Sequence, residues 1–103
     1  MNRIAVVSAD ASITSQACAY AEYRAFAVVA RHTRRVRNVR LVLRHAAGRG
    51  TCGKVTCSVT AVLEDGSSLR IRVTGPHVYA AINRAVERLG PALGQRIEQR
   101  LSS

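Results

Sequence analysis

The sequence of 103 residues contains no tryptophan, one phenylalanine, two prolines and only six acidic residues. Its three cysteines, Cys18, Cys52 and Cys57, are an odd number without a C-x-x-C pair, which argues against a disulfide framework and a structural zinc site. No uncharged run is long enough to span a membrane, and the apolar run after Arg3 is too short for a secretory leader. We therefore expect a reduced, cytoplasmic protein.

Positive charge is abundant. Sixteen Lys and Arg residues against six Asp and Glu give a formal net charge of +10 and a pI near 11.2, and Lys54 is the sole lysine. The length accommodates one domain, which we place at residues 1–103. A single domain this basic usually has a polyanionic partner, with nucleic acid the first candidate and an acidic membrane the second.

Hydrophobic periodicity predicts the first two elements. Residues 3–9 are typical of a short buried strand, and residues 13–33 of a helix, because neither glycine nor proline interrupts them and apolar residues recur at helical spacing. Asp10 and Ser12 are the candidates for the N-cap of this helix. The apolar positions at helical spacing are Ile13, Ala17, Tyr20, Ala21, Ala27 and Val28.

Strict alternation then predicts three half-buried strands at residues 39–44, 54–63 and 68–74. The segment 64–67, Glu-Asp-Gly-Ser, is typical of a hairpin turn, so these strands form an antiparallel meander. A second helix follows Gly75-Pro76, and we expect Gly90-Pro91 to kink or break it. Its apolar stripe is Tyr79, Ile82, Val86, Leu89, Leu93 and Ile97.

The predicted fold class is α+β, in the order β-α-β-β-β-α. We expect one four-stranded sheet with two helices packed on one face, an arrangement like that of double-stranded-RNA-binding domains.

The start of the second helix carries a family resemblance. Residues 74–83, Thr-Gly-Pro-His-Val-Tyr-Ala-Ala-Ile-Asn, resemble the G-x-D-x-Y-A-A-I-D signature of ribosome hibernation-promoting factors and ribosome-associated inhibitors, the sigma-54 modulation protein family. Ser12-Ile13-Thr14, the strand at 39–43 and the hairpin around Gly66 also fit that family. His77 and Asn83 stand where the family usually has aspartate. Part of the family's basic run is replaced by Pro91, Gln95 and Ile97.

The resemblance implies a function in translation. Proteins of this family bind the small ribosomal subunit and its 16S ribosomal RNA near the decoding centre, in the channel used by messenger and transfer RNA. Occupying that channel blocks initiation and promotes hibernation under stress, without covalent chemistry, a cofactor, a small-molecule substrate or a membrane. Longer members carry a separate C-terminal dimerisation domain that is not in this sequence, so the resemblance implies a short form. The oligomeric state stays open.

Arginines are the candidate RNA ligands, because guanidinium forks suit phosphates. A cluster spans the end of the first helix and the start of the next strand. If Arg84 and Arg88 face Arg24 and Arg31 across the helix pair, a positive groove results. The candidate residues are Arg24, Arg31, Arg34, Arg35, Arg37, Arg84, Arg88, Arg96 and Arg100. A second candidate RNA surface, on the outer face of the sheet, consists of Arg40, Arg44, Lys54, Arg70 and Arg72.

We expect structural roles for the remaining polar and aromatic residues. We expect the tyrosines, Tyr20, Tyr23 and Tyr79, to pack in the protein, and His77 to cap or line the second helix. The acidic residues are scattered, and neither a metal set nor a Ser-His-Asp arrangement can be placed, so no enzyme is predicted. Cys52 lies among glycines, and its redox role is open.

Two alternatives to the ribosomal function remain. One is a generic structured-RNA-binding module. The other is a protein-interaction or regulatory domain whose charge serves solubility.

Overall fold

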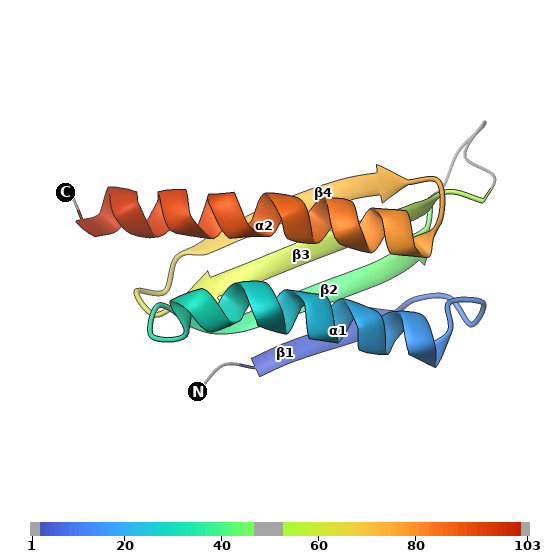
Figure 1. Cartoon of the computed structure of the whole chain (residues 1–103), viewed down its shortest axis with the longest axis horizontal. Coiled ribbons are helices and arrows are strands. Elements are labelled where there is room, and N and C mark those ends of the chain that lie inside the picture. The colour runs from blue at the N-terminus through green and yellow to red at the C-terminus, as the bar shows by residue number, and fades with distance from the viewer. Residues whose placement is uncertain (1–2, 47–52, 102–103) are drawn as a thin grey trace.

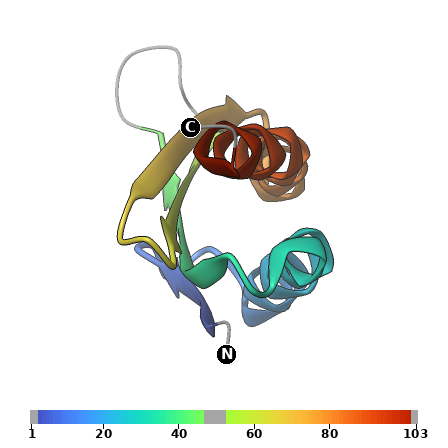
Figure 2. The same cartoon turned by 90° about the vertical axis from the view of Figure 1, so that its left-hand side faces the viewer.

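The computed structural model describes residues 3–46 and 53–101, with the side chains of residues 100 and 101 left out. The elements are β1 (Arg3–Ser8), α1 (Ser15–Val29), a 3-10 turn (Ala30–His32), β2 (Val36–His45), β3 (Val55–Leu63), β4 (Ser68–Gly75) and α2 (Val78–Leu101). They form one sheet with both helices on the same face (Figures 1 and 2). The predicted fold class and element order are confirmed.

The sheet has the order β1-β2-β3-β4. Strand β1 runs parallel to β2, with Arg3 opposite Asn38, while β2, β3 and β4 form the expected antiparallel meander. Because it lies at the edge of the sheet, β1 alternates between exposed and half-buried residues. The prediction that it is a buried strand was therefore wrong.

The core lies between the sheet and the two helices. The inward positions of β2 and β3, such as Leu41 and Val59, are fully buried, and Ile82, Leu89 and Leu93 of α2 cover them. The alternation in the sequence assigned these strand residues to the correct face. At the far end of β3, Gly66 adopts a φ of +88° in the turn to β4, where glycine is favoured over residues with a side chain.

Helix α1 begins two residues later than the sequence suggested. Thr14 is the N-cap, and its hydroxyl accepts a hydrogen bond of 3.1 Å from the Ala17 N–H. The cap expected from Asp10 or Ser12 was wrong, because these two residues bond each other instead. The buried face consists of small residues at four-residue spacing, which lets the helix approach the sheet closely. These residues are Ala17, Ala21, Ala25 and Val29.

Helix α2 is continuous through Pro91. Of the two outcomes expected at Gly90-Pro91, a kink or a break, the break does not occur, although the proline leaves the carbonyl of Glu87 without its helical donor. Leu89 and Leu93, on either side of the proline, are both fully buried and hold the helix on the sheet. Pro91 itself is exposed, so water can reach the turn that lacks the hydrogen bond.

The junction between β4 and α2 explains why Gly75 stands in the segment 74–83 that resembles the family signature. A Cβ on Gly75 would lie 2.6 Å from the backbone nitrogen of Ala81, closer than real atoms approach. Two residues later, His77 caps the helix, since its Nδ1 accepts a hydrogen bond of 3.3 Å from the Ala80 N–H. The predicted capping role of His77 is confirmed.

Candidate nucleic-acid interface

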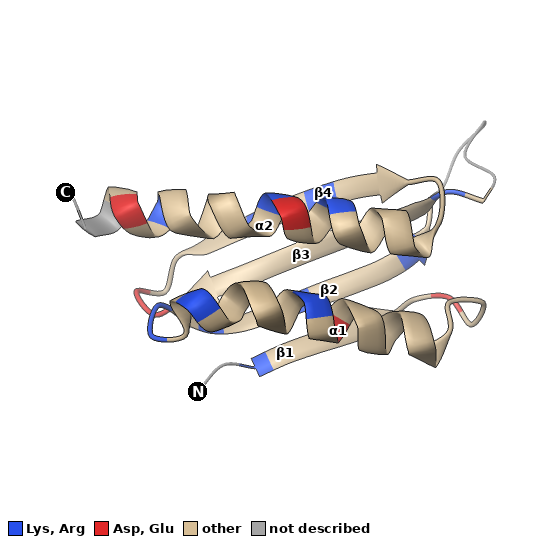
Figure 3. Cartoon of the chain, viewed as in Figure 1, with Lys and Arg blue, Asp and Glu red and all other residues tan. Residues whose placement is uncertain are grey.

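Exposed arginines gather where the end of α1, the turn into β2 and the start of β1 meet, at the left of Figure 3. We call this group, Arg3, Arg31, Arg34, Arg35 and Arg37, the basic end; all five side chains are exposed. The sequence predicted four of them as a cluster. It did not predict Arg3, which the parallel pairing of β1 with β2 brings opposite Asn38.

The basic end is held in place by the turn between β3 and β4. The Glu64 N–H donates a hydrogen bond of 2.9 Å to the carbonyl of Arg35. Arg37 donates to the carbonyl of Glu64 at 3.2 Å and lies 3.9 Å from its carboxylate. Both side chains of this ion pair are half exposed, so it adds little stability.

Three arginines of the basic end remain available. Among the described residues, the side chains of Arg31, Arg34 and Arg35 have neither a hydrogen bond nor an ion pair. Arginines near a helix C-terminus are favoured by the helix dipole, but this effect does not require three unpaired guanidinium groups in succession. Their fork geometry suits phosphate oxygens.

Arg24 lies on α1 between two residues that contact α2. The Tyr20 hydroxyl donates a hydrogen bond of 2.7 Å to the side-chain oxygen of Asn83. Val28 lies 3.5 Å from the position of a Cβ on Gly90. Since residues four apart share a side of a helix, Arg24 also faces α2. Its Nε is buried and has no hydrogen-bond partner in the described part of the chain.

The α2 arginines do not complete the groove expected between the helices. Arg84 donates a hydrogen bond of 3.0 Å to the carbonyl of Thr74 in β4, so it turns away from α1. Arg88 follows one helical turn later on the same side and is exposed. The α2 residue one turn after Asn83, on the side toward α1, is Glu87. The geometric condition for the groove is therefore not met.

Arg96 also contacts β4, through a hydrogen bond of 3.2 Å to the carbonyl of Ser68. Arg84 and Arg96 thus bind carbonyls at the two ends of the outer edge of β4, where the strand has no partner in the sheet. Such contacts cover an edge that otherwise invites pairing with another strand. The backbone of Arg100 lies in α2, and its side chain is outside the described residues.

The outer face of the sheet carries four exposed arginines, which we call the sheet arginines: Arg40, Arg44, Arg70 and Arg72. The register places Arg40 and Arg70 in one row, on either side of Thr60. The outward positions of the four strands hold no carboxylate and no aromatic residue. Lys54 is exposed just before β3, outside the strand in which it was predicted. Both helices lie on the opposite face, so this surface is open (Figure 2).

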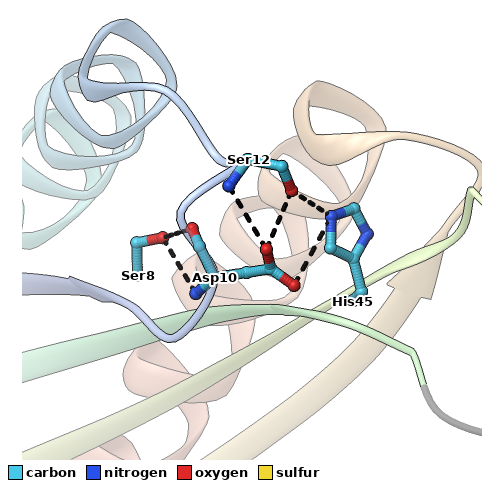
Figure 4. A network of polar contacts seen from close by, with 4 residues as sticks. All are labelled: Ser8, Asp10, Ser12 and His45. Carbon is cyan, nitrogen blue, oxygen red and sulfur yellow. Dashed lines mark hydrogen bonds and ion pairs between the residues drawn. The ribbon is translucent and has the colours of Figure 1, made fainter.

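The structure brings together a serine, a histidine and an aspartate that sequence reasoning did not place (Figure 4). Ser12 Oγ lies 2.5 Å from His45 Nε2 and donates a hydrogen bond of 2.9 Å to Asp10 Oδ1. Asp10 Oδ2 lies 3.7 Å from the same nitrogen of His45. In a hydrolytic triad the aspartate binds the other ring nitrogen and holds the histidine toward the serine. This network therefore links the β1–α1 loop to the end of β2 and does not activate a nucleophile.

The carboxyl of Asp10 is stabilised as an anion in this network. Hydrogen bonds from the Ser12 backbone N–H, and next from the Ser12 hydroxyl, lower the pKa of Asp10, and the charge of His45 lowers it further. Elsewhere, burial raises the pKa of the Cys57 thiol to about 11, so this thiol is not reactive near neutral pH. Cys52, whose redox role was left open, lies outside the described residues.

The aromatic residues divide into a pair whose rings contact each other, of which Tyr79 is 40% exposed, and a pair that is more exposed. Tyr20 and Tyr79 pack edge to face, with ring centroids 5.2 Å apart, as predicted for helix packing. Tyr23 and Phe26 are 71% and 61% exposed. The prediction that Tyr23 packs in the protein was wrong, because it lies on the side of α1 opposite the buried alanines.

No group of His, Cys, Asp and Glu suited to a metal ion occurs within residues 3–46 and 53–101. The helices in these ranges are too short or too polar to cross a membrane.

No protein-family model and no curated protein matches the sequence. Solved structures do match, and two of them are similar over nearly the whole chain. The N-terminal domain of Protein Y from Thermus thermophilus is 24% identical, with a TM-score of 0.72, over 92% of this chain and 98% of that one. A ribosomal subunit interface protein from Coxiella burnetii is 11% identical, with a TM-score of 0.77, over 93% of this chain and 98% of that one.

The chain has the fold of these two proteins. The resemblance seen in residues 74–83 is thus confirmed at the level of the fold. At these identities the likeness concerns backbone architecture, so the ligands of this chain have to be inferred from its own side chains.

Proposed function

We propose that this protein binds the small ribosomal subunit through its 16S ribosomal RNA and suppresses translation in resting cells. The observation that carries the proposal is the basic end, where Arg31, Arg34 and Arg35 are exposed and unpaired within the described residues. The fold it shares with a protein described as a ribosomal subunit interface protein supports a ribosomal partner. The net charge of +10 supports an RNA surface as the target.

The mechanism is steric. The protein occupies the channel for messenger and transfer RNA near the decoding centre, held by contacts between arginines and phosphates, and initiation is blocked while it remains bound. No bond is made or broken, and no cofactor is needed. The protein acts in the cytoplasm, where the ribosomes are. Release of counterions from the RNA drives binding, so the affinity falls steeply with salt.

The test is co-sedimentation of the protein with purified small subunits and with intact ribosomes, at low and at moderately high salt. We expect saturation near one protein per small subunit and loss of initiator-tRNA binding. The absence of protein from the pellet at low salt would contradict the ribosomal proposal.

Two variants that each remove three positive charges locate the interface. We expect Arg31→Gln/Arg34→Gln/Arg35→Gln to weaken binding at least tenfold. The slope of log K against log salt should fall by roughly 2–3, because each lost phosphate contact removes about 0.7–0.9. The matched control is Arg40→Gln/Arg70→Gln/Arg72→Gln on the sheet. Equal binding of the basic-end variant and the unmodified protein would remove the basic end from the proposal.

The sheet arginines favour a second candidate function, a generic structured-RNA-binding module. An open face with four cations and no carboxylate can follow the phosphate backbone of a folded RNA without reading its sequence. Competition separates the two candidates. Messenger and transfer RNA displace a channel-bound protein from ribosomes, whereas a generic module also binds unrelated duplex RNA with similar affinity.

A further inference from the structure

Two of the four aromatic residues of this chain have more than half of their surface exposed. Tyr23 is 71% and Phe26 is 61% exposed, while Tyr20 and Tyr79 pack against each other. Aromatic side chains have a large apolar surface, and burying it is favourable. Since Ala21 and Ala25 form the buried side of α1, the core does not need the two exposed rings.

Tyr23 and Phe26 form one surface. They are three residues apart on α1, a spacing that places side chains next to each other on a helix. Together with Ile4 of β1 and Ala19 and Glu22 of α1, they line a shallow depression between the helix and the edge strand. We call Tyr23 and Phe26 the aromatic pair.

The basic end adjoins the aromatic pair at the C-terminal end of α1. Arg3 precedes the Ile4 that lines the depression, and Arg31 lies just beyond the C-terminal end of α1. Arg24, although next to Tyr23 in sequence, faces α2 and lies on another side of the helix. Glu22 is the one acidic residue of the lining. Exposed rings beside a cluster of arginines suit an unpaired nucleic-acid strand, whose bases stack on aromatic faces while its phosphates contact guanidinium groups. A duplex keeps its bases stacked inside and presents mainly sugar and phosphate.

We propose that Tyr23 and Phe26 are a stacking platform for unpaired bases of a single-stranded RNA segment whose phosphates extend to the basic end. The proposal rests on the RNA-binding function inferred above and deepens it, because it names unpaired RNA as the ligand of α1. The sheet arginines, which have no aromatic residue among them, lack such a platform.

The experiment compares two double variants. Tyr23→Ala/Phe26→Ala removes both rings, and Tyr23→Phe/Phe26→Tyr exchanges them but keeps both aromatic faces. Because the rings are exposed, both variants are expected to unfold in urea at nearly the same midpoint as the unmodified protein. Binding is measured by fluorescence anisotropy with a labelled, unstructured RNA of about 12 nucleotides, within the range of known single-strand sites. Inorganic polyphosphate, which has charge but no bases, is the second probe.

We expect the alanine variant to bind the RNA roughly 10- to 100-fold more weakly, since stacking contributes about 1–3 kcal/mol per base. Its salt slope and its affinity for polyphosphate should not change, and the ring-exchange variant should bind like the unmodified protein. Unchanged RNA affinity of the alanine variant would overturn the proposal and indicate a protein partner for the aromatic pair. An equal loss for RNA and polyphosphate would also overturn it, because the effect would not depend on bases.

Failure of the RNA-binding function itself would give a different binding result. If the unmodified protein binds neither the RNA nor polyphosphate at low salt, the RNA-binding function itself is wrong. If the unmodified protein binds both probes and the alanine variant binds the RNA with the same affinity, only the stacking platform is wrong.

Discussion

Two residues at the junction of β4 and α2 give the resemblance in residues 74–83 a structural explanation. Gly75 is required because a Cβ there would collide with the Ala81 backbone. His77 replaces the usual aspartate, and its Nδ1 serves as the acceptor that caps the helix. The motif could be recognised from the sequence, but the reason for the glycine required the distance between β4 and α2.

Gly75→Ala should destabilise the protein by about 1–3 kcal/mol, the usual range for forcing extra atoms into a packed site. The measurement is the free energy of unfolding in urea. Gly94→Ala is the control, because nothing lies within 4 Å of a Cβ at Gly94 in α2. That variant should gain roughly 0.5–1 kcal/mol, since alanine favours helix over glycine. Similar stability of Gly75→Ala and the unmodified protein would refute the close approach.

Asp10 gives the protein a pH dependence on the acid side. Its pKa in the folded state is lowered from 3.8, so its contribution to stability is present above about pH 4 and lost as the pH falls through the lower folded value. Asp10→Asn should therefore show a flatter decline of the melting temperature between about pH 4 and pH 2 than the unmodified protein. Parallel melting curves against pH would show that the Ser12 hydrogen bonds do not favour the ionised form.

At the scale of elements, the sequence predicted the strands better than the helix ends. Alternation is a local property, so the faces of β2, β3 and β4 followed from it directly. The N-cap of α1 did not, because Asp10, Ser12 and Thr14 are all suitable caps. Asp10 and Ser12 bond each other and contact the distant His45, and Thr14 caps the helix. Whether Gly90-Pro91 breaks α2 could not be decided from the sequence either, since the packing of its neighbouring leucines outweighs the local effect of Pro91.

Pro91→Ala should stabilise the protein by about 1–2 kcal/mol. The change restores the backbone N–H that can bond the carbonyl of Glu87, and the exposed site has no packing to lose. Thermal unfolding followed by circular dichroism measures the effect. A lower melting temperature would mean that the proline shapes α2 in a way the core requires.

Arg84 and Arg96 were predicted as RNA ligands, whereas their hydrogen bonds give them a structural role at the edge of β4. Arg84→Gln/Arg96→Gln should cost about 1 kcal/mol of stability. It should weaken ribosome binding less than the basic-end variant does. Arg88→Gln, on the same side of α2, is the control and should leave the urea midpoint unchanged. A loss of ribosome binding equal to that of the basic-end variant would return these two arginines to the interface.

For the whole molecule, composition alone indicated a polyanionic partner, but the placement of charge depended on tertiary structure. The cluster at residues 31–37 was visible because its members are close in sequence. Arg3 joins it only through the pairing of β1 with β2. The expected groove does not form because the rotation of α2, which turns Asn83 toward Tyr20 of α1, cannot be derived from spacing within α2 alone. The exposed aromatic pair was missed because α1 is apolar around most of its circumference.

The parallel pairing of β1 also has a consequence for the order in which the strands fold. Contacts within β2, β3 and β4 join residues close in the chain, whereas β1 meets β2 about 35 residues away, with Arg3 opposite Asn38. Closing the longer loop costs more entropy, so we expect the meander to form before β1 docks on it. In amide exchange, we therefore expect the protons of β1 to exchange faster than those of β3, through partial openings that leave the rest of the sheet intact.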